Sequence, residues 1–261
     1  MSLSNRWRRL IDIIPSERCR AMARASFDLC IQRMRYGLPQ SCALCATASG
    51  DALICSACTS ALPRNGGACP NCALPGVAGS VCGACLKRPP PFATCIAAWS
   101  YAFPVDRLVQ ALKYGGQLAL AAPMADALVK AIECSGQPCP DLVVALPLFP
   151  ARQRKRGFNQ AQEIARGIAA ATGLRFAAGL ARVREGPPQV ELGWGERTRN
   201  MRGAYRGHPV LAGRRVAIVD DVMTTGATLS AAATAACNAG ARDVVAWVVA
   251  RTPRPAEGIA A

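Results

Sequence analysis

Four pairs of cysteines with C-x2-C spacing constrain this 261-residue chain more than any other feature. The pairs lie in one stretch near the N-terminus and are separated by nine, ten and nine residues. They comprise Cys42, Cys45, Cys55, Cys58, Cys69, Cys72, Cys82 and Cys85. The stretch is a duplication of C-x2-C-x9-C-x2-C with an offset of 27 residues. Because two C-x2-C turns supply the four sulfurs of a tetrahedral zinc site, we predict two structural zinc ions here.

Two other chemistries are compatible with this spacing. The first alternative is disulfide bonds, which are rare in a reducing cytosol. Residues 1–35 carry eight arginines and no apolar segment typical of a secretory signal, so an oxidising compartment is not expected. Four thiolates also suit a rubredoxin-like iron site. The connectivity stays open at this point, since each copy can close its own site or the pairs can interleave in a cross-brace. Four thiolates fill the coordination shell, so a structural and not a catalytic metal is expected.

The rest of the chain changes character after KRPPPF, Lys87 to Phe92, a charged, Pro-rich segment that is incompatible with a helix. This segment predicts a boundary between a double zinc-knuckle domain, 39–88, and a second domain, 93–254. Residues 1–38 are expected to be a basic, helical extension and 255–261 a flexible tail. No apolar run approaches the roughly 18 residues that a membrane span needs.

Apolar runs alternate with amphipathic stretches in the second domain. Strands are expected at 95–103, 141–147, 215–219 and 243–250, and helices at 104–114, 118–133, 159–172 and 228–238. A basic loop is expected between the strand that ends at Pro147 and the helix that begins at Asn159. Strands that are continuously apolar and separated by helices predict an α/β fold, a parallel sheet flanked by helices.

Ligands of such sheets bind beyond the carboxyl ends of the strands, where residues Asp220 to Thr228 open directly into a predicted helix. Small hydroxyl residues, a glycine and a helix N-terminus suit an anion. The adjacent carboxylates of Asp220 and Asp221 suit the vicinal hydroxyls of a sugar or a hard cation such as Mg2+. Together these features describe a ribose 5-phosphate pocket, although an Asp/Thr-rich helix cap without a ligand has the same pattern.

The thirteen residues VAIVDDVMTTGAT resemble the phosphoribosyl pyrophosphate (PRPP) signature of type I phosphoribosyltransferases. The chain as a whole resembles the ComF family across most of 39–254. The matching motifs are CPNCALP, KRPPPF, LKYGG, ALPLFPARQRKRGFNQ, PPQVELGWGERTRNMRGAY and ARTPRP. The resemblance implies a type I phosphoribosyltransferase domain that follows a small zinc-knuckle domain.

The resemblance also implies roles for individual residues. Asp220 and Asp221 would meet the ribose hydroxyls and are the catalytic candidates. The phosphate-binding candidates are Val222, Met223, Thr224, Thr225, Gly226, Ala227 and Thr228. The pyrophosphate-loop candidates are Arg152, Arg156, Gly157, Asn159 and Gln160, where a cluster of cations beside a helix N-terminus can trap an anion. A mobile hood loop would contribute Gln189, Arg197 and Asn200.

The family resemblance implies a cytoplasmic protein that binds PRPP or ribose 5-phosphate with Mg2+. It leaves open whether the chain is an active pentosyl transferase (a glycosyltransferase), and the acceptor is not identified. ComF relatives are associated with competence and DNA uptake, which implies internalised single-stranded DNA and competence or recombination proteins as partners. There are two alternatives. One is a non-catalytic module that binds nucleic acid or protein and keeps the pocket as a ligand sensor. The other is a relative linked to the use of gluconate or another sugar.

Charge is distributed unevenly along this chain of net charge +15. Residues 151–206 hold twelve basic and four acidic residues, whereas 42–85 hold one of each. Nucleic acid is therefore expected to bind along the basic loops of the second domain and not on the zinc module. The aromatic residues available there for base stacking are Phe158, Phe176, Trp194 and Tyr205. The one histidine, His208, is expected to be a surface residue.

Overall fold

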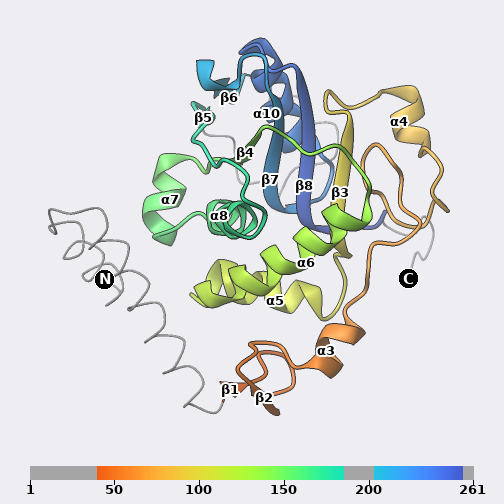
Figure 1. Ribbon diagram of the computed structural model, residues 1–261, viewed down its shortest axis with the longest axis vertical. Coiled ribbons are helices and arrows are strands. Elements are labelled where there is room, and N and C mark those ends of the chain that lie inside the picture. The colour runs from red at the N-terminus through yellow and green to blue at the C-terminus, as the bar shows by residue number, and fades with distance from the viewer. Residues whose placement is uncertain (1–39, 185–202, 255–261) are drawn as a thin grey trace, which may run out of the picture. The chain divides into compact units, whose positions relative to one another are not determined.

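The computed structural model describes residues 40–184 and 203–254, and the chain divides into two compact units between Ser60 and Ala61 (Figure 1). The predictions for residues 1–38, for the tail 255–261 and for Gln189, Arg197 and Asn200 lie outside the described residues. The first unit contains a short antiparallel pair, β1 (Gln40–Ser41) and β2 (Ala48–Gly50), before α3 (Ser56–Ala61).

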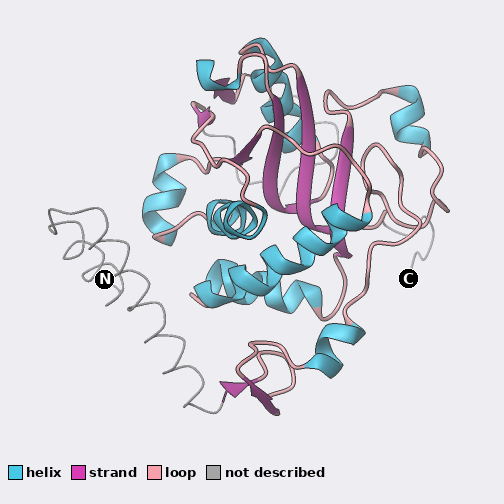
Figure 2. Cartoon of the chain, in the orientation of Figure 1, coloured by secondary structure: helices cyan, strands magenta, loops and turns pink. Residues whose placement is uncertain are grey.

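A four-stranded parallel sheet forms the centre of the second unit (Figure 2). Its strands are β3 (Thr94–Ser100), β4 (Leu142–Ala145), β7 (Arg215–Met223) and β8 (Asp243–Arg251), in the order β3-β8-β7-β4. The central strand β8 is buried over all but its first residue, because helices cover both faces of the sheet. The prediction of a parallel sheet flanked by helices is confirmed.

The flanking helices have the expected bounds to within a few residues. They are α5 (Val105–Tyr114), a 3-10 turn at Leu118–Leu120 that continues into α6 (Ala121–Cys134), α8 (Gln160–Thr172) and α10 (Ala227–Asn238). Helices α6 and α8 pack against each other and on the sheet, and α10 covers its other face (Figure 1). No helix within 40–184 or 203–254 is long and apolar enough to cross a membrane.

Three details differ from the expected elements. The basic segment before Gly157 forms a short helix, α7 (Pro150–Arg156), because Pro150 occupies its first turn and favours helix initiation there. Strand β7 continues through Asp220 and Asp221, which therefore lie in the sheet and not in the following loop. A second small sheet joins β5 (Leu180–Arg182) to β6 (Tyr205–Gly207), followed by a 3-10 turn at Pro209–Leu211 that His208 caps.

The second copy of the cysteine motif belongs to the same compact unit as the sheet. It includes α4 (Gly83–Lys87), and its cysteines share one buried core with sheet and α10 residues such as Ile218 and Ala232. The Thr94 hydroxyl donates a 2.6 Å hydrogen bond to the carbonyl of Pro70, and Asn65 donates one of 2.9 Å to that of Ala73. The two compact units thus divide between the two copies of the cysteine motif.

Candidate functional site

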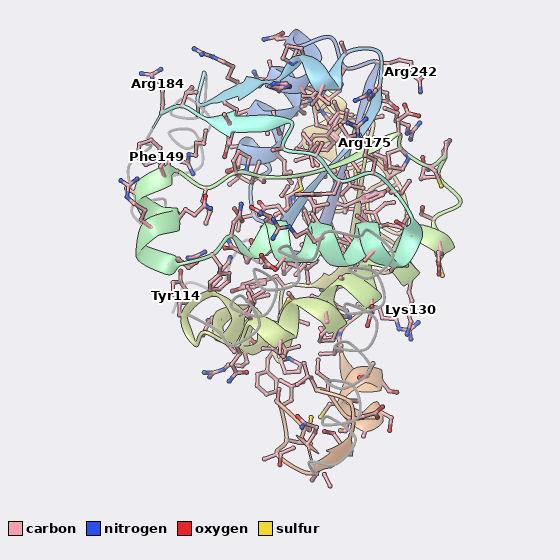
Figure 3. The ribbon with its side chains drawn as sticks, turned by 60° about the vertical axis from the view of Figure 1, so that its left-hand side comes forward. Tyr114, Lys130, Phe149, Arg175, Arg184 and Arg242 are labelled. Atoms are coloured by element: carbon pink, nitrogen blue, oxygen red, sulfur yellow. The ribbon has the colours of Figure 1, made fainter. Side chains whose placement is uncertain are left out.

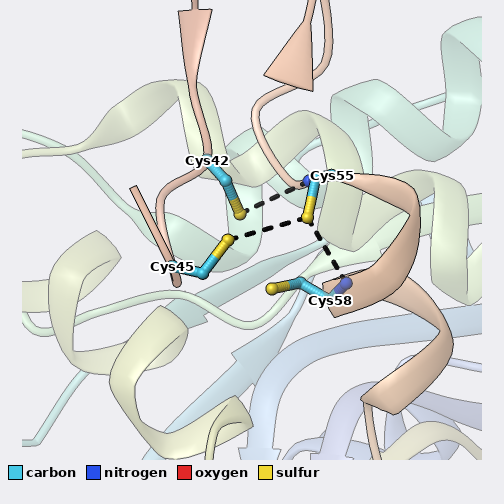
Figure 4. Close-up of side chains that lie close together, drawn as sticks. All are labelled: Cys42, Cys45, Cys55 and Cys58. Atoms are coloured by element: carbon cyan, nitrogen blue, oxygen red, sulfur yellow. Dashed lines mark hydrogen bonds between the residues drawn. The ribbon is translucent and has the colours of Figure 1, made fainter. Parts of the chain in front are cut away.

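The first cysteine cluster gathers Cys42, Cys45, Cys55 and Cys58 with their sulfurs within 4.8 Å of one another (Figure 4). The sulfurs of Cys45 and Cys55 are 3.7 Å apart. Burial raises the pKa of the Cys42 thiol, but the backbone amides of Cys55, Cys45 and Leu44 together lower it to about 6. A thiolate therefore forms readily at Cys42, and a bound cation would favour the ionised form of all four cysteines.

The second cluster repeats this geometry with Cys69, Cys72, Cys82 and Cys85, and all four residues are buried. The amide of Cys82 donates a 3.4 Å hydrogen bond to the Cys69 sulfur, just as the amide of Cys55 does to the Cys42 sulfur at the same distance. The sulfurs of Cys72 and Cys82 are 3.6 Å apart. The two copies thus have the same internal hydrogen bond and differ in burial.

Both clusters fit zinc. Sulfurs that each lie about 2.3 Å from a tetrahedral zinc are about 3.8 Å from one another, close to the 3.7 Å and 3.6 Å separations observed. Each copy of the motif closes its own four-sulfur site, which settles the connectivity that the spacing left open. Of the remaining described cysteines, Cys95 is buried and Cys134, Cys139 and Cys237 are exposed.

We expect metal analysis of the purified protein to find about two zinc ions per chain. Because each copy closes its own site, Cys42→Ser is expected to reduce the content to about one ion, and Cys69→Ser to do the same. Loss of both ions from either single variant would contradict two independent sites. A folded wild-type chain without metal would contradict the zinc assignment itself.

The end of β7 places two carboxylates side by side. Oδ1 of Asp220 accepts a 2.8 Å hydrogen bond from the amide of Asp221, and Oδ1 of Asp221 accepts one of the same length from the amide of Val222. These bonds fix both side chains against their own backbone. Asp221 is buried, with an exposed fraction of 3%, while Asp220 is half-buried.

The loop that follows, 224–226, combines a left-handed glycine with carbonyls that are already paired. Gly226 has φ +80° and caps α10, and an added Cβ would lie 2.5 Å from the Met223 side chain, so this position requires glycine. The guanidinium of Arg251 donates hydrogen bonds to the carbonyls of Met223 and Thr224. The amides of residues 224–226 donate no hydrogen bond to any other described residue. The loop therefore offers amide donors that no described residue occupies, beside a helix N-terminus, as an anion site requires.

Lys113 is a site residue that the sequence reasoning missed. It is the lysine of the LKYGG motif and lies in the last turn of α5. Its ammonium group is 2.7 Å from Oδ2 of Asp221, and its side chain is 21% exposed. The sequence signal was present, because LKYGG is one of the motifs of the family resemblance, but the partner of the lysine lies 108 residues further along the chain.

The segment expected to bind pyrophosphate meets the same α5 terminus. Arg156 lies 5.3 Å from the ring centroid of Tyr114 and donates a 2.7 Å hydrogen bond to Gln160. Asn159 is buried, caps α8 by accepting from the amide of Ala161, and donates to the carbonyl of Leu146 at the end of β4. Gly157 ends α7 with φ +82°, and Arg152 is exposed on that helix. LKYGG therefore contacts both predicted ligand segments, through Lys113 and Tyr114.

Electrostatics in the site raise the pKa of Asp220, which lies next to the ion pair of Lys113 and Asp221. Burial raises the pKa of Asp220 well above its ordinary value, the Asp221 carboxylate raises it further, and Lys113 lowers it. Burial lowers the pKa of Lys113, but its interaction with Asp221 more than offsets this and leaves it raised. A ligand that brings a cation or hydroxyl donors to Asp220 would stabilise its ionised form.

Comparisons with known proteins agree with this architecture. The double zinc ribbon domain family matches residues 34–86, and the phosphoribosyl transferase domain family matches residues 116–259. The DNA utilization protein YhgH of Salmonella typhi is 34% identical over 205 residues, which cover 76% of this chain and 90% of that protein. Its namesake from Escherichia coli K12 is 31% identical over 82% of this chain and 98% of that protein. Competence protein F of Haemophilus influenzae is 28% identical over 65% of this chain and 78% of that protein.

The sheet, its flanking helices and the two four-cysteine clusters define a phosphoribosyltransferase-fold protein with a double zinc ribbon. The chain is more than 30% identical, over more than 200 residues, to relatives that are named DNA utilization proteins. The chain belongs to the ComF family, as the resemblance of its motifs predicted.

The raised pKa of Asp220 predicts a pH-dependent stability. Between its ordinary pKa and its raised pKa, the folded state holds a proton that the unfolded chain has released, so stability falls as pH rises through that range. We expect Asp220→Asn to remove this dependence and to unfold at a higher temperature than the wild type at pH 8. Thermal unfolding at pH 5 and pH 8 measures the effect. Identical pH profiles for the two proteins would contradict it.

Proposed function

We propose that the chain binds PRPP, or a related ribose 5-phosphate, with Mg2+ at the end of β7. The observation that carries this proposal is the juxtaposition of two fixed carboxylates, Asp220 and Asp221, with the loop 224–226, whose amides donate to no other described residue. A phosphate accepts hydrogen bonds from such amides and from the N-terminus of α10. The carboxylates accept hydrogen bonds from vicinal hydroxyls.

The neighbouring groups extend the proposed site. Carboxylate oxygens are ligands that Mg2+ accepts, usually together with phosphate oxygens of a bound substrate, so the donor set of Asp220 and Asp221 fits the cation. Arg156 would face the pyrophosphate end of the ligand from the junction of α7 and α8. In the free protein Lys113 neutralises Asp221, and it becomes a cation available to the ligand when Mg2+ or a diol takes its place.

The reaction that such a site supports is pentosyl transfer. In this reaction pyrophosphate leaves C1 of the ribose and a nucleophile, usually a nitrogen of a base, attacks there. Fixed cations and amides stabilise the negative charge that develops on pyrophosphate, and the carboxylates orient the ribose. The release of pyrophosphate from PRPP, assayed across bases with and without single-stranded DNA, distinguishes an enzyme from a ligand sensor. The reduced cysteines that the zinc sites need are consistent with the cytosol as the proposed compartment.

PRPP with Mg2+ is expected to stabilise the wild-type protein against heat. A ligand at about 100 times its Kd stabilises the folded state by about 2.7 kcal/mol, or roughly 5–10 °C for a domain of this size. Asp220→Asn/Asp221→Asn should abolish the shift and keep the zinc content of the wild type. A wild-type protein that shows no shift with millimolar PRPP and Mg2+ would refute the proposed site.

A second candidate function, binding of single-stranded DNA, is favoured by the names of the relatives and by the basic segment 151–206. Several of its arginines are exposed, among them Arg184 and Arg206. The candidates for base stacking are fewer than the sequence suggested. Tyr205 is buried, Phe158 and Phe176 are half-buried, and Trp194 lies outside the described residues. We therefore propose an electrostatic mode of binding with little sequence preference.

This mode predicts that affinity for single-stranded DNA falls steeply with salt. Each phosphate contact contributes about 0.7 to the slope of log K against log salt, so Arg184→Ala/Arg206→Ala should reduce the slope by about 1.4. Lys130→Ala serves as the control, because Lys130 is exposed on α6, on the other side of this unit from Arg184 (Figure 3). Affinity that is insensitive to salt would contradict the electrostatic mode.

A further inference from the structure

Arg251, the last residue of β8, connects the second cysteine cluster to the proposed ligand loop. Its Nε donates a 2.9 Å hydrogen bond to the carbonyl of Cys72, a zinc-ligand candidate. Its Nη1 donates to the carbonyls of Met223, at 3.1 Å, and of Thr224. A single side chain thus contacts the backbone of a cysteine of the second cluster and the first residues of the loop. The segments that it joins lie about 150 residues apart in sequence.

The environment of Arg251 makes these contacts costly to lose. The residue is 3% exposed, and no carboxylate among the described residues lies within ion-pair distance of it. A buried guanidinium needs hydrogen-bond acceptors or negative charge to offset its desolvation. The carbonyls supply the acceptors. Four thiolates around one Zn2+ carry a formal charge of −2, and this cluster would supply the negative charge.

A cavity of about 1120 Å3 lies next to this link. Cys72, Cys82 and Cys85 line it together with Arg251 and the loop residues Thr225 and Gly226. Because this space is not filled by side chains of the described residues, packing alone holds the loop weakly on that side. The hydrogen bonds of Arg251 therefore restrain the loop together with those that the amide of Thr252 donates to Met223 and the amide of Ser230 donates to Gly226.

We propose that Arg251 is a positioning residue that couples zinc in the second cluster to ligand affinity at the loop 224–226. Loss of that zinc frees the backbone at Cys72, weakens the hold of Arg251 on the carbonyls of Met223 and Thr224, and loosens the amides that receive the phosphate. This inference rests on the proposed function for its effect on PRPP, while the coupling of zinc to loop order stands independently of the ligand. The first cluster, in the other compact unit, is expected to lack this coupling.

The experiment measures three quantities in each variant: zinc content, the Kd for PRPP in Mg2+ by calorimetry, and hydrogen exchange of the amides in 223–228. Cys85→Ser removes zinc from the second cluster, and Cys45→Ser from the first. We expect Cys85→Ser and Arg251→Met each to raise the Kd about tenfold, within the usual range for coupled sites, and to speed amide exchange in the loop. Cys45→Ser should lose one zinc and leave both the Kd and the exchange rates unchanged.

Two further variants separate positioning from a general loss of structure. Arg242→Met removes a cation directly before the first residue of β8, at the other end of this strand from Arg251. Arg242 (Figure 3) pairs there with Asp141 and its side chain is 64% exposed, so the change should alter neither Kd nor exchange. The double variant Cys85→Ser/Arg251→Met should have the same Kd and the same amide exchange as either single variant, because both changes act through one link. Arg251→Lys retains the charge and should restore part of the affinity, and it replaces Arg251→Met if that variant does not fold.

The outcomes are distinguishable. Additive effects of the two changes, or equal effects of Cys45→Ser and Cys85→Ser on the loop, would overturn the coupling. If the wild type does not bind PRPP, the proposed function fails, and the exchange of the loop amides still decides whether zinc in the second cluster and Arg251 order the loop. Unchanged exchange in Cys85→Ser would then reject the inference by itself.

Discussion

The hydrogen bonds of one buried guanidinium, that of Arg251, join two segments that lie about 150 residues apart in the sequence. They join the carbonyl of Cys72 to those of Met223 and Thr224. These bonds occupy the carbonyls, while no described residue accepts a hydrogen bond from the amides of residues 224–226. In the proposed site, Arg251 would therefore help to set which backbone groups of the loop face a phosphate.

The parallel sheet explains why charged groups from distant segments meet at one edge. The carboxyl ends of β4 and β7 lie side by side, and the C-terminal end of α5 reaches both through Lys113 and Tyr114. Two adjacent carboxylates, one buried and one half-buried, are unfavourable by themselves. The ammonium group of Lys113 offsets part of the repulsion, and the pKa of Asp220 stays raised. The free protein thus stores an electrostatic imbalance that a cation or a diol would relieve.

The two copies of the cysteine motif have different structural surroundings. The first copy forms a small unit whose sulfurs are partly exposed, whereas the second has all four residues buried in the core of the sheet domain. Its metal would thereby stabilise the larger domain as well as the ribbon. Equal spacing in sequence does not imply equal roles, because the surroundings of each copy differ.

The sequence by itself determined the two zinc sites, the parallel sheet and the loop at the end of β7. Cysteine spacing, apolar periodicity and the DDVMTTGAT segment are local patterns, and local geometry is enough to interpret them. It did not determine which cysteines share an ion, that residues 150–156 are helical, or that Lys113, Tyr114 and Arg251 belong to the site. Lys113, Tyr114 and Arg251 were assigned by tertiary structure, because their partners Asp221, Arg156 and Cys72 are distant in sequence. Which cysteines share an ion was decided by the three-dimensional arrangement of the sulfurs. The helix at 150–156 has a local cause, Pro150 in its first turn, which the sequence reasoning did not use. A lysine or arginine shows its charge in the sequence, but only the fold shows which groups its charge and hydrogen bonds reach.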